Sequence, residues 1–164
     1  MRWITRENVR VDRVACPWLI KRFVDPDAEF LFVPEAHLLD TAAQQGATPF
    51  DAARLPEVTL NHRGARCTFE AILEDFHLTD PALDRLGRIV RAADVKGQEH
   101  AASEGAGLRA IAEGFALSGI SDAERLRLQF PMYDALFEYA RGTLQVHEEL
   151  AASGDTLSRR DVDA

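Results

Sequence analysis

Cysteine and lysine are both scarce in this sequence. Its 164 residues include 2 cysteines, Cys16 and Cys67, which stand far apart and have no CxxC companion. That spacing excludes a disulfide framework and a zinc-finger pattern, and it favours reduced thiols in a cytoplasmic protein. Lys21 and Lys96 are the only lysines, so arginine supplies the other 17 of the 19 basic residues. This bias reflects either a GC-rich genome or a use of the rigid guanidinium fork for binding anions.

Long apolar runs and excess positive charge are missing as well. The apolar stretch at residues 30–34 is far shorter than the roughly 20 residues that span a bilayer, and charge follows the first residues where a signal peptide would be apolar. A soluble cytoplasmic protein without a membrane partner is expected. The net charge of −8 argues against nucleic-acid binding by this chain alone. No nucleotide cofactor is indicated, because P-loop and GxGxxG motifs are absent, as are GxSxG and HExxH.

The first part of the sequence predicts strands and helices in alternation. Residues 2–5 are a short strand candidate, and a helix is expected to open at Pro17, a residue suited to a first helical position. The apolar run at residues 29–33 predicts a second strand. A helix over residues 35–45 and a third strand over residues 58–62 complete this half.

The remainder of the chain predicts helices. Thr68 can cap a helix that reaches Phe76, and Asp80-Pro81 opens another with apolar residues at helical spacing. Further helices are expected over residues 103–115 and from Ser121, where Pro131 should kink or split the last one. The fold class is therefore α+β: a small sheet of about three strands on several helices, with a helix-rich C-terminal half. We expect one domain over residues 1–150 and a flexible tail over residues 151–164.

Arginines gather ahead of the first predicted helix. Arg6, Arg10 and Arg13 flank Asp12, and free backbone N–H groups at a helix beginning at Pro17 would point into the same region. Such an arrangement can bind a dianion. The alternative is that these arginines pair with some of the 27 acidic residues.

The two cysteines are candidates for redox chemistry. Cys16 lies at the same predicted helix start, where nearby guanidinium groups would lower the pKa of its thiol. Cys67 lies in a second polar cluster, just before the helix expected at Thr68. A buried and inert cysteine is nevertheless the commoner state of a free thiol.

Possible metal ligands occupy two loop regions. His62 and Glu70 flank a predicted turn, and Asp94 and His100 lie where a predicted helix ends. Histidine with carboxylate partners is ordinary ligand chemistry for one divalent ion, zinc, iron or manganese. The pattern has no HxH or HxxxH pair, so these residues are equally compatible with a solvated surface.

Several segments together resemble a known family. They are WITR at residues 3–6, DRVACPWLIKRF at 12–23, EFLFVP at 29–34, ATPFD at 47–51, His62, CTFE at 67–70, IVRAAD at 89–94 and YDAL at 133–136. Over residues 1–141 the chain resembles the C-terminal domain of ChrB-type chromate-resistance proteins. The resemblance implies a role in chromate resistance, with Arg6, Arg13 and His62 at family motif positions as the candidates for sensing. Full-length regulators of this type carry a further N-terminal region ahead of this motif, so DNA binding is not expected of this chain.

Three functional hypotheses follow. The first is a domain that binds a small, chromate-like oxyanion or a metal ion in a polar pocket, using Arg6, Arg13 and His62. Chromate is a tetrahedral dianion like sulfate, so telling the two apart would need a bound metal or a redox-active thiol. The second is a metal-dependent hydrolase or oxidoreductase with a histidine and carboxylate site. The third is an interaction domain without a ligand, and a homodimer remains open in each case.

Overall fold

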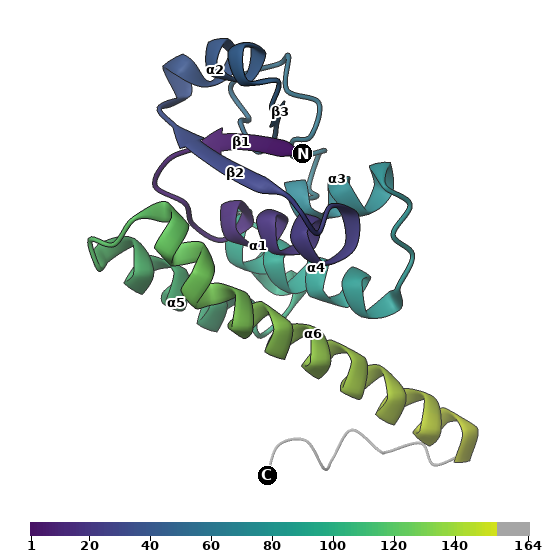
Figure 1. The fold of residues 1–164 in the computed structure, drawn as a ribbon. Coiled ribbons are helices and arrows are strands. Elements are labelled where there is room, and N and C mark those ends of the chain that lie inside the picture. The colour runs from purple at the N-terminus through teal and green to yellow at the C-terminus, as the bar shows by residue number, and fades with distance from the viewer. Residues whose placement is uncertain (154–164) are drawn as a thin grey trace.

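A computed structural model describes residues 1–153 and shows a small parallel sheet beside a group of helices (Figure 1). The strands β1 (Arg2–Arg6), β2 (Glu29–Val33) and β3 (Thr48–Pro49) lie in the order β2-β1-β3. This arrangement confirms the predicted α+β class with about three strands. The predicted tail is outside the described residues from position 154 onward, and residues 151–153 belong to the last helix.

The third strand is not where the sequence predicted it. Within residues 58–62, the backbone makes a single bridge, in which Leu60 pairs with Phe50 in parallel. The amide side chain of Asn61 accepts from the backbone N–H of Ala52 at 2.7 Å and donates to the carbonyls of Ala52 and Val58 at 3.0 and 3.1 Å. These bonds hold the segment in an irregular conformation, because side-chain amides can replace ladder partners of the backbone.

The first helix is also placed differently from the prediction. Helix α1 (Asp12–Leu19) begins at Asp12 and contains Pro17 in its interior, and it continues into a π-helical turn, η1 (Ile20–Val24). The backbone N–H groups of Val14 and Ala15 both bond to the carbonyl of Val11, which starts the helix before the proline is reached. The prediction of a helix that begins at Pro17, with an anion site at its N-terminus, is therefore wrong.

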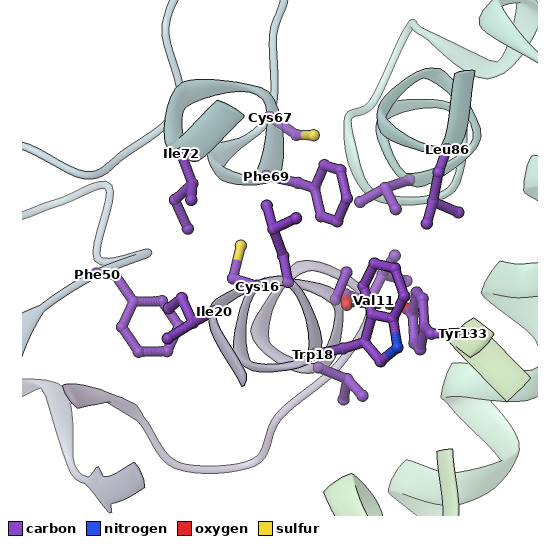
Figure 2. Close-up of a cluster of buried hydrophobic side chains, with 14 of the residues drawn as sticks. Val11, Cys16, Trp18, Ile20, Phe50, Cys67, Phe69, Ile72, Leu86 and Tyr133 are labelled. Carbon is purple, nitrogen blue, oxygen red and sulfur yellow. Dashed lines mark hydrogen bonds between the residues drawn. The ribbon is translucent and has the colours of Figure 1, made fainter. Parts of the chain in front are cut away.

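Helix α1 is the centre of the molecule. Figure 2 shows it seen nearly end-on, with side chains of α3 (Thr68–Asp75), α4 (Pro81–Asp94) and α6 (Asp122–Ser153) packed around it. Trp18 is 1% exposed and stacks on Phe69 of α3 with ring centroids 6.4 Å apart. It also contacts the ring of Tyr133, which is fully buried. Aromatic packing of this kind fixes α1 against α3 and α6.

The two faces of the sheet are covered by different elements. Trp3 of β1 belongs to the main core with α1, whereas Ile4 packs with Leu38 and Ala42 of α2 (Leu38–Gln45). A short 3₁₀ turn, η2 (Glu35–His37), precedes α2, so the predicted helix over residues 35–45 is present in two parts. Trp3 and Ile4 reach different faces of the sheet because successive side chains of a strand point to opposite sides.

The C-terminal half is helical, as predicted. Asp80 caps α4 by accepting a bond from the backbone N–H of Ala82, and the 3₁₀ turn η3 (Glu99–Ala101) leads to α5 (Gly105–Leu117). Helix α6 runs on through Pro131, so the chain is not split there. The carbonyl left without a donor belongs to Arg127, which is exposed, so water can supply the bond. Among residues 1–153, no helix combines the length and apolarity needed to cross a bilayer.

The closest approach of two helices gives a stability test. A Cβ on Gly105 of α5 would lie 2.5 Å from the Cβ of Ala92 in α4 and 2.8 Å from its backbone carbon. Gly105→Ala is therefore expected to lower the free energy of unfolding by about 1–3 kcal/mol. Gly114→Ala, in the same helix with no atom within 4 Å, should raise it by up to about 1 kcal/mol. Urea denaturation measures both, and equal effects would contradict the packing account.

Candidate metal centre

Three carboxylates converge on one imidazole nitrogen. The Nε2 atom of His62 lies 3.3 Å from Asp12 Oδ2, 3.4 Å from Asp51 Oδ1 and 3.3 Å from Asp94 Oδ2. Asp12 begins α1, Asp94 ends α4, Asp51 follows β3, and His62 lies in the loop before α3. The side chain of His62 is 30% exposed, whereas that of Asp12 is 1% exposed. The cluster therefore has a buried base and one side open to solvent.

Asp12 is held rigidly at that base. Its Oδ2 accepts a hydrogen bond from the backbone N–H of Thr68 at 2.7 Å, and its Oδ1 accepts one from Phe69 at 3.1 Å. These are the first N–H groups of α3, so the first residue of α1 caps another helix. Burial, together with the negative charges of Asp94 and Asp51, raises the pKa of Asp12 to about 6, against the opposing effect of His62.

Asp51 is the second buried carboxylate and is neutralised by other partners. It adopts a positive φ of 49°, which a short polar side chain tolerates better than most. The hydroxyl of Thr68 donates to its Oδ1 at 2.8 Å, and Arg13 Nε lies 3.4 Å from its Oδ2. Burial alone would raise the pKa of Asp51, but His62, Thr68 and Arg13 together hold that pKa below its ordinary value.

The N-terminal arginines meet carboxylates and carbonyls. The Nε of Arg6 donates to the Asp51 carbonyl at 3.2 Å, and its Nη1 donates to Glu35 at 3.1 Å. Arg13 donates to the carbonyls of Arg6 and Glu7 and pairs with Asp51. The structure therefore brings Arg6, Arg13 and His62 to the same carboxylate. It also gives both guanidinium groups partners within the protein.

Both cysteines are buried in surroundings that disfavour the thiolate. Cys16 is fully buried in the core drawn in Figure 2, and its thiol donates to Asp12 Oδ1 at 3.2 Å. Burial, followed by the charge of Asp12, raises the pKa of the Cys16 thiol well above its usual range. Burial does the same for Cys67. The expected lowering of the Cys16 pKa is wrong, because a carboxylate lies beside the thiol where guanidinium groups were expected.

Two residues predicted as metal ligands lie outside the cluster. One Glu70 oxygen accepts a bond from the backbone N–H of Cys67 at 2.9 Å, and the other lies 3.2 Å from Arg91 Nη1. Glu70 therefore completes the N-terminal cap of α3 and faces away from His62. His100 is exposed in η3 and does not join the cluster. Asp94, by contrast, meets His62 as the sequence suggested.

The spacing of the nitrogen and oxygen atoms in the cluster suits a cation. Good N–H···O bonds have lengths of about 2.7–3.2 Å, and one Nε2 cannot donate to three oxygens at once. Ligands about 2.0–2.1 Å from a tetrahedral metal are separated by about 3.3–3.4 Å, which is the spacing around His62. Asp12, His62 and Asp94 each offer an atom within 4.8 Å of the others, and among residues 1–153 this is the one such group.

Sequence reasoning missed the roles of Asp12 and Asp51. A signal for Asp12 was available, because it directly precedes the apolar segment from Val14 to Ile20, where an acid must be buried and therefore needs partners. No comparable signal marks Asp51, since its neighbours His62 and Thr68 are brought to it only by folding.

The carboxylates also predict how stability depends on pH. The carboxylates of Asp12, Asp51 and Asp94 around Nε2 outweigh burial and raise the pKa of His62 from 6.5 to about 12. The raised pKa stabilises the metal-free fold below pH 6.5, and this contribution is lost as pH rises toward about 12. In an NMR titration of metal-free protein, the His62 ring should therefore show no midpoint between about pH 6 and about pH 8.

Asp94→Asn is the matched control for this titration, because it removes one charge at constant size. That variant is expected to lower the pKa of His62 and to flatten the pH dependence of the unfolding free energy. An His62 midpoint near its ordinary value of 6.5 in the unsubstituted protein would contradict the geometry described above.

Comparison with known proteins assigns the chain to a family. Residues 3–140 match the family model described as "ChrB, C-terminal domain". The chain is also 40% identical over 113 residues to Protein ChrB of Cupriavidus metallidurans, an alignment that covers 68% of this chain and 32% of that protein. The chain thus spans about a third of the curated relative's length. No solved structure matches the chain significantly. Because the family model covers most of its length, the chain belongs to the ChrB C-terminal domain family.

Proposed function

We propose that this domain binds one divalent metal ion through Asp12, His62 and Asp94. The observation that carries the proposal is the set of carboxylate oxygens 3.3–3.4 Å from a single imidazole nitrogen. A cation at the centre would compensate carboxylates that are otherwise costly to bury together. It would also replace the proton on His62 Nε2, which cannot bond to all three carboxylate oxygens at once.

The donor set favours zinc, iron or manganese. One imidazole nitrogen and two carboxylate oxygens are ligands that borderline and hard divalent ions accept. Cys16 donates to Asp12 and so supports a ligand instead of being one. Three protein ligands leave further positions for water or a small molecule, which is typical of sensing or catalytic sites and not of purely structural ones.

The surrounding hydrogen bonds support the same assignment. The backbone N–H groups of Thr68 and Phe69 fix the orientation of Asp12, and the backbone N–H of Asp12 lies 3.4 Å from Asp94 Oδ1. Outer partners of this kind orient metal ligands and tune their basicity. Asp51, held by Thr68 and Arg13, adds negative charge beside the cluster without belonging to it.

Membership in the ChrB family links the proposed site to chromate resistance. One role is a sensor in which the metal, or an oxyanion bound to it, reports on the chemical state of the cell. A metal-dependent hydrolase or oxidoreductase remains the alternative, because the open coordination positions also suit catalysis.

Direct oxyanion binding is a second candidate, supported by one observation. Arg6, Arg13 and His62 meet at Asp51, as a shared anion site would require. An oxyanion there would have to displace the Asp51 and Glu35 contacts of the guanidinium groups, however, and three nearby carboxylates would repel it.

Calorimetry distinguishes the two candidates. Metal-free protein is expected to show no measurable heat with chromate, because its arginines are already paired. Chromate binding by metal-free protein that is lost in Arg6→Lys would favour direct oxyanion binding and count against the metal proposal.

Metal titration tests the main proposal. Zinc and manganese should bind with a stoichiometry near one and raise thermal stability, by about 2.7 kcal/mol at a free metal concentration of 100 Kd. Binding at about pH 7 should release close to one proton, because the imidazole must lose its proton before coordinating. Calorimetry in buffers of different ionisation enthalpy measures both quantities.

Substitutions provide the specificity of this test. His62→Ala and Asp94→Asn are expected to weaken metal binding by more than about tenfold. His100→Ala is the control, because His100 is exposed and outside the cluster. Circular dichroism confirms folding of each variant. Full metal affinity in a folded His62→Ala protein would refute the proposal.

A further inference from the structure

We propose that a groove beside the metal centre binds a small organic acid, with its carboxylate at the metal and its hydrocarbon part between α4 and α5. The inference rests on the proposed function, because Asp94 is both a proposed metal ligand and a wall of this groove. It extends the proposed function by naming the class of small molecule that would bind beside the metal ion.

The groove consists of two adjoining cavities. The first, of about 450 Å³, is lined by Asp94 and Lys96 together with charged side chains of α5. The second, of about 320 Å³, is lined by Ala92, Ala106 and Ala110. Both cavities share the side chains of Glu99, Arg109 and Glu113 as walls. Their volumes are in the range of small-molecule sites, roughly 300–1,000 Å³.

Most charges along the groove neutralise one another. Arg10 forms an ion pair with Glu113, and Arg109 lies 3.7 Å from Glu99 while its Nε donates to the Ala93 carbonyl at 2.7 Å. These pairs leave little charge for a ligand to meet along the side walls.

Lys96 is different. Among residues 1–153 its ammonium group makes no hydrogen bond or ion pair, and it is exposed at the polar end, two positions after Asp94. A divalent ion held by Asp12 and Asp94 is balanced by those two carboxylates, so Lys96 is the unmatched charge at this end, and it is positive. An anionic oxygen group therefore suits the end of the groove nearest the metal.

The other end suits hydrocarbon. Ala106 and Ala110 are exposed on α5 and Ala92 is buried on α4, so three methyl groups line this cavity together with Ser103. Small side chains here leave room for several carbons, and burial of each methylene adds affinity. A carboxylate with a short aliphatic chain matches both ends, whereas an inorganic oxyanion would leave the apolar end empty.

A series of straight-chain carboxylates tests the inference. Acetate, butyrate and hexanoate are titrated by calorimetry into zinc-loaded protein and into the metal-free form. For the zinc-loaded protein we expect affinity to rise at least about tenfold from acetate to hexanoate. The metal-free form should bind each acid at least about tenfold more weakly, because the carboxylate loses its metal contact.

Three variants assign the two ends of the groove. Lys96→Met should weaken all three acids to a similar extent, since each presents the same carboxylate. Ala106→Glu should weaken hexanoate and leave acetate unchanged, because it places charge at the apolar end. Arg88→Met is the control: Arg88 is exposed on α4 and lines neither cavity.

The outcomes separate this inference from the metal proposal. Zinc binding with no acid binding, or with equal affinity for acetate and hexanoate, would overturn the groove inference alone. Absence of zinc binding would refute the proposed function first, as measured in the metal titration. Equal hexanoate affinity with and without zinc would overturn the assignment of the carboxylate to the metal.

Discussion

The fold and the candidate site both depend on the buried carboxylate of Asp12. It accepts the first backbone N–H groups of α3 while starting α1 itself, so one side chain fixes the relation between two helices. The same carboxylate faces His62 at the base of the cluster. A buried carboxylate is tolerated only with such partners, because its desolvation costs several kcal/mol when it has none. Core packing and ligand geometry are therefore set by the same group.

The cluster concentrates charge that the rest of the fold must support. Asp12 and Asp51 are buried and Asp94 is largely covered, while the opposing charges come from His62 and Arg13. Tight aromatic packing around α1 holds these groups in place despite their repulsion. Sites with opposed and desolvated charges are frequently functional, because a ligand can relieve what the empty arrangement cannot. A divalent cation has the right sign and a suitable size to do so.

The position of the cluster also determines what can reach it. Its base is held by α1 and the start of α3, and Asp94 at the end of α4 is shared with a neighbouring cavity that the loop leading to α5 also lines. Loops at the ends of rigid helices often carry ligand sites, because the helices fix the geometry and the loops give access. Both thiols are buried, and that of Cys16 donates to Asp12 from within the core.

Sequence patterns were sufficient to predict the α+β class, the helical second half and the family, and they nominated His62 and Asp94 as candidate ligands. These follow from local patterns: apolar periodicity, a capping residue before Pro81, and long motif matches. Folding alone brings Asp12 and Asp51 to His62, pairs Glu70 with Arg91, and limits Leu60 to a single bridge with Phe50. Each of these depends on contacts between residues far apart in the chain. Residue types indicate which ligands are available, but long-range packing decides which of them meet.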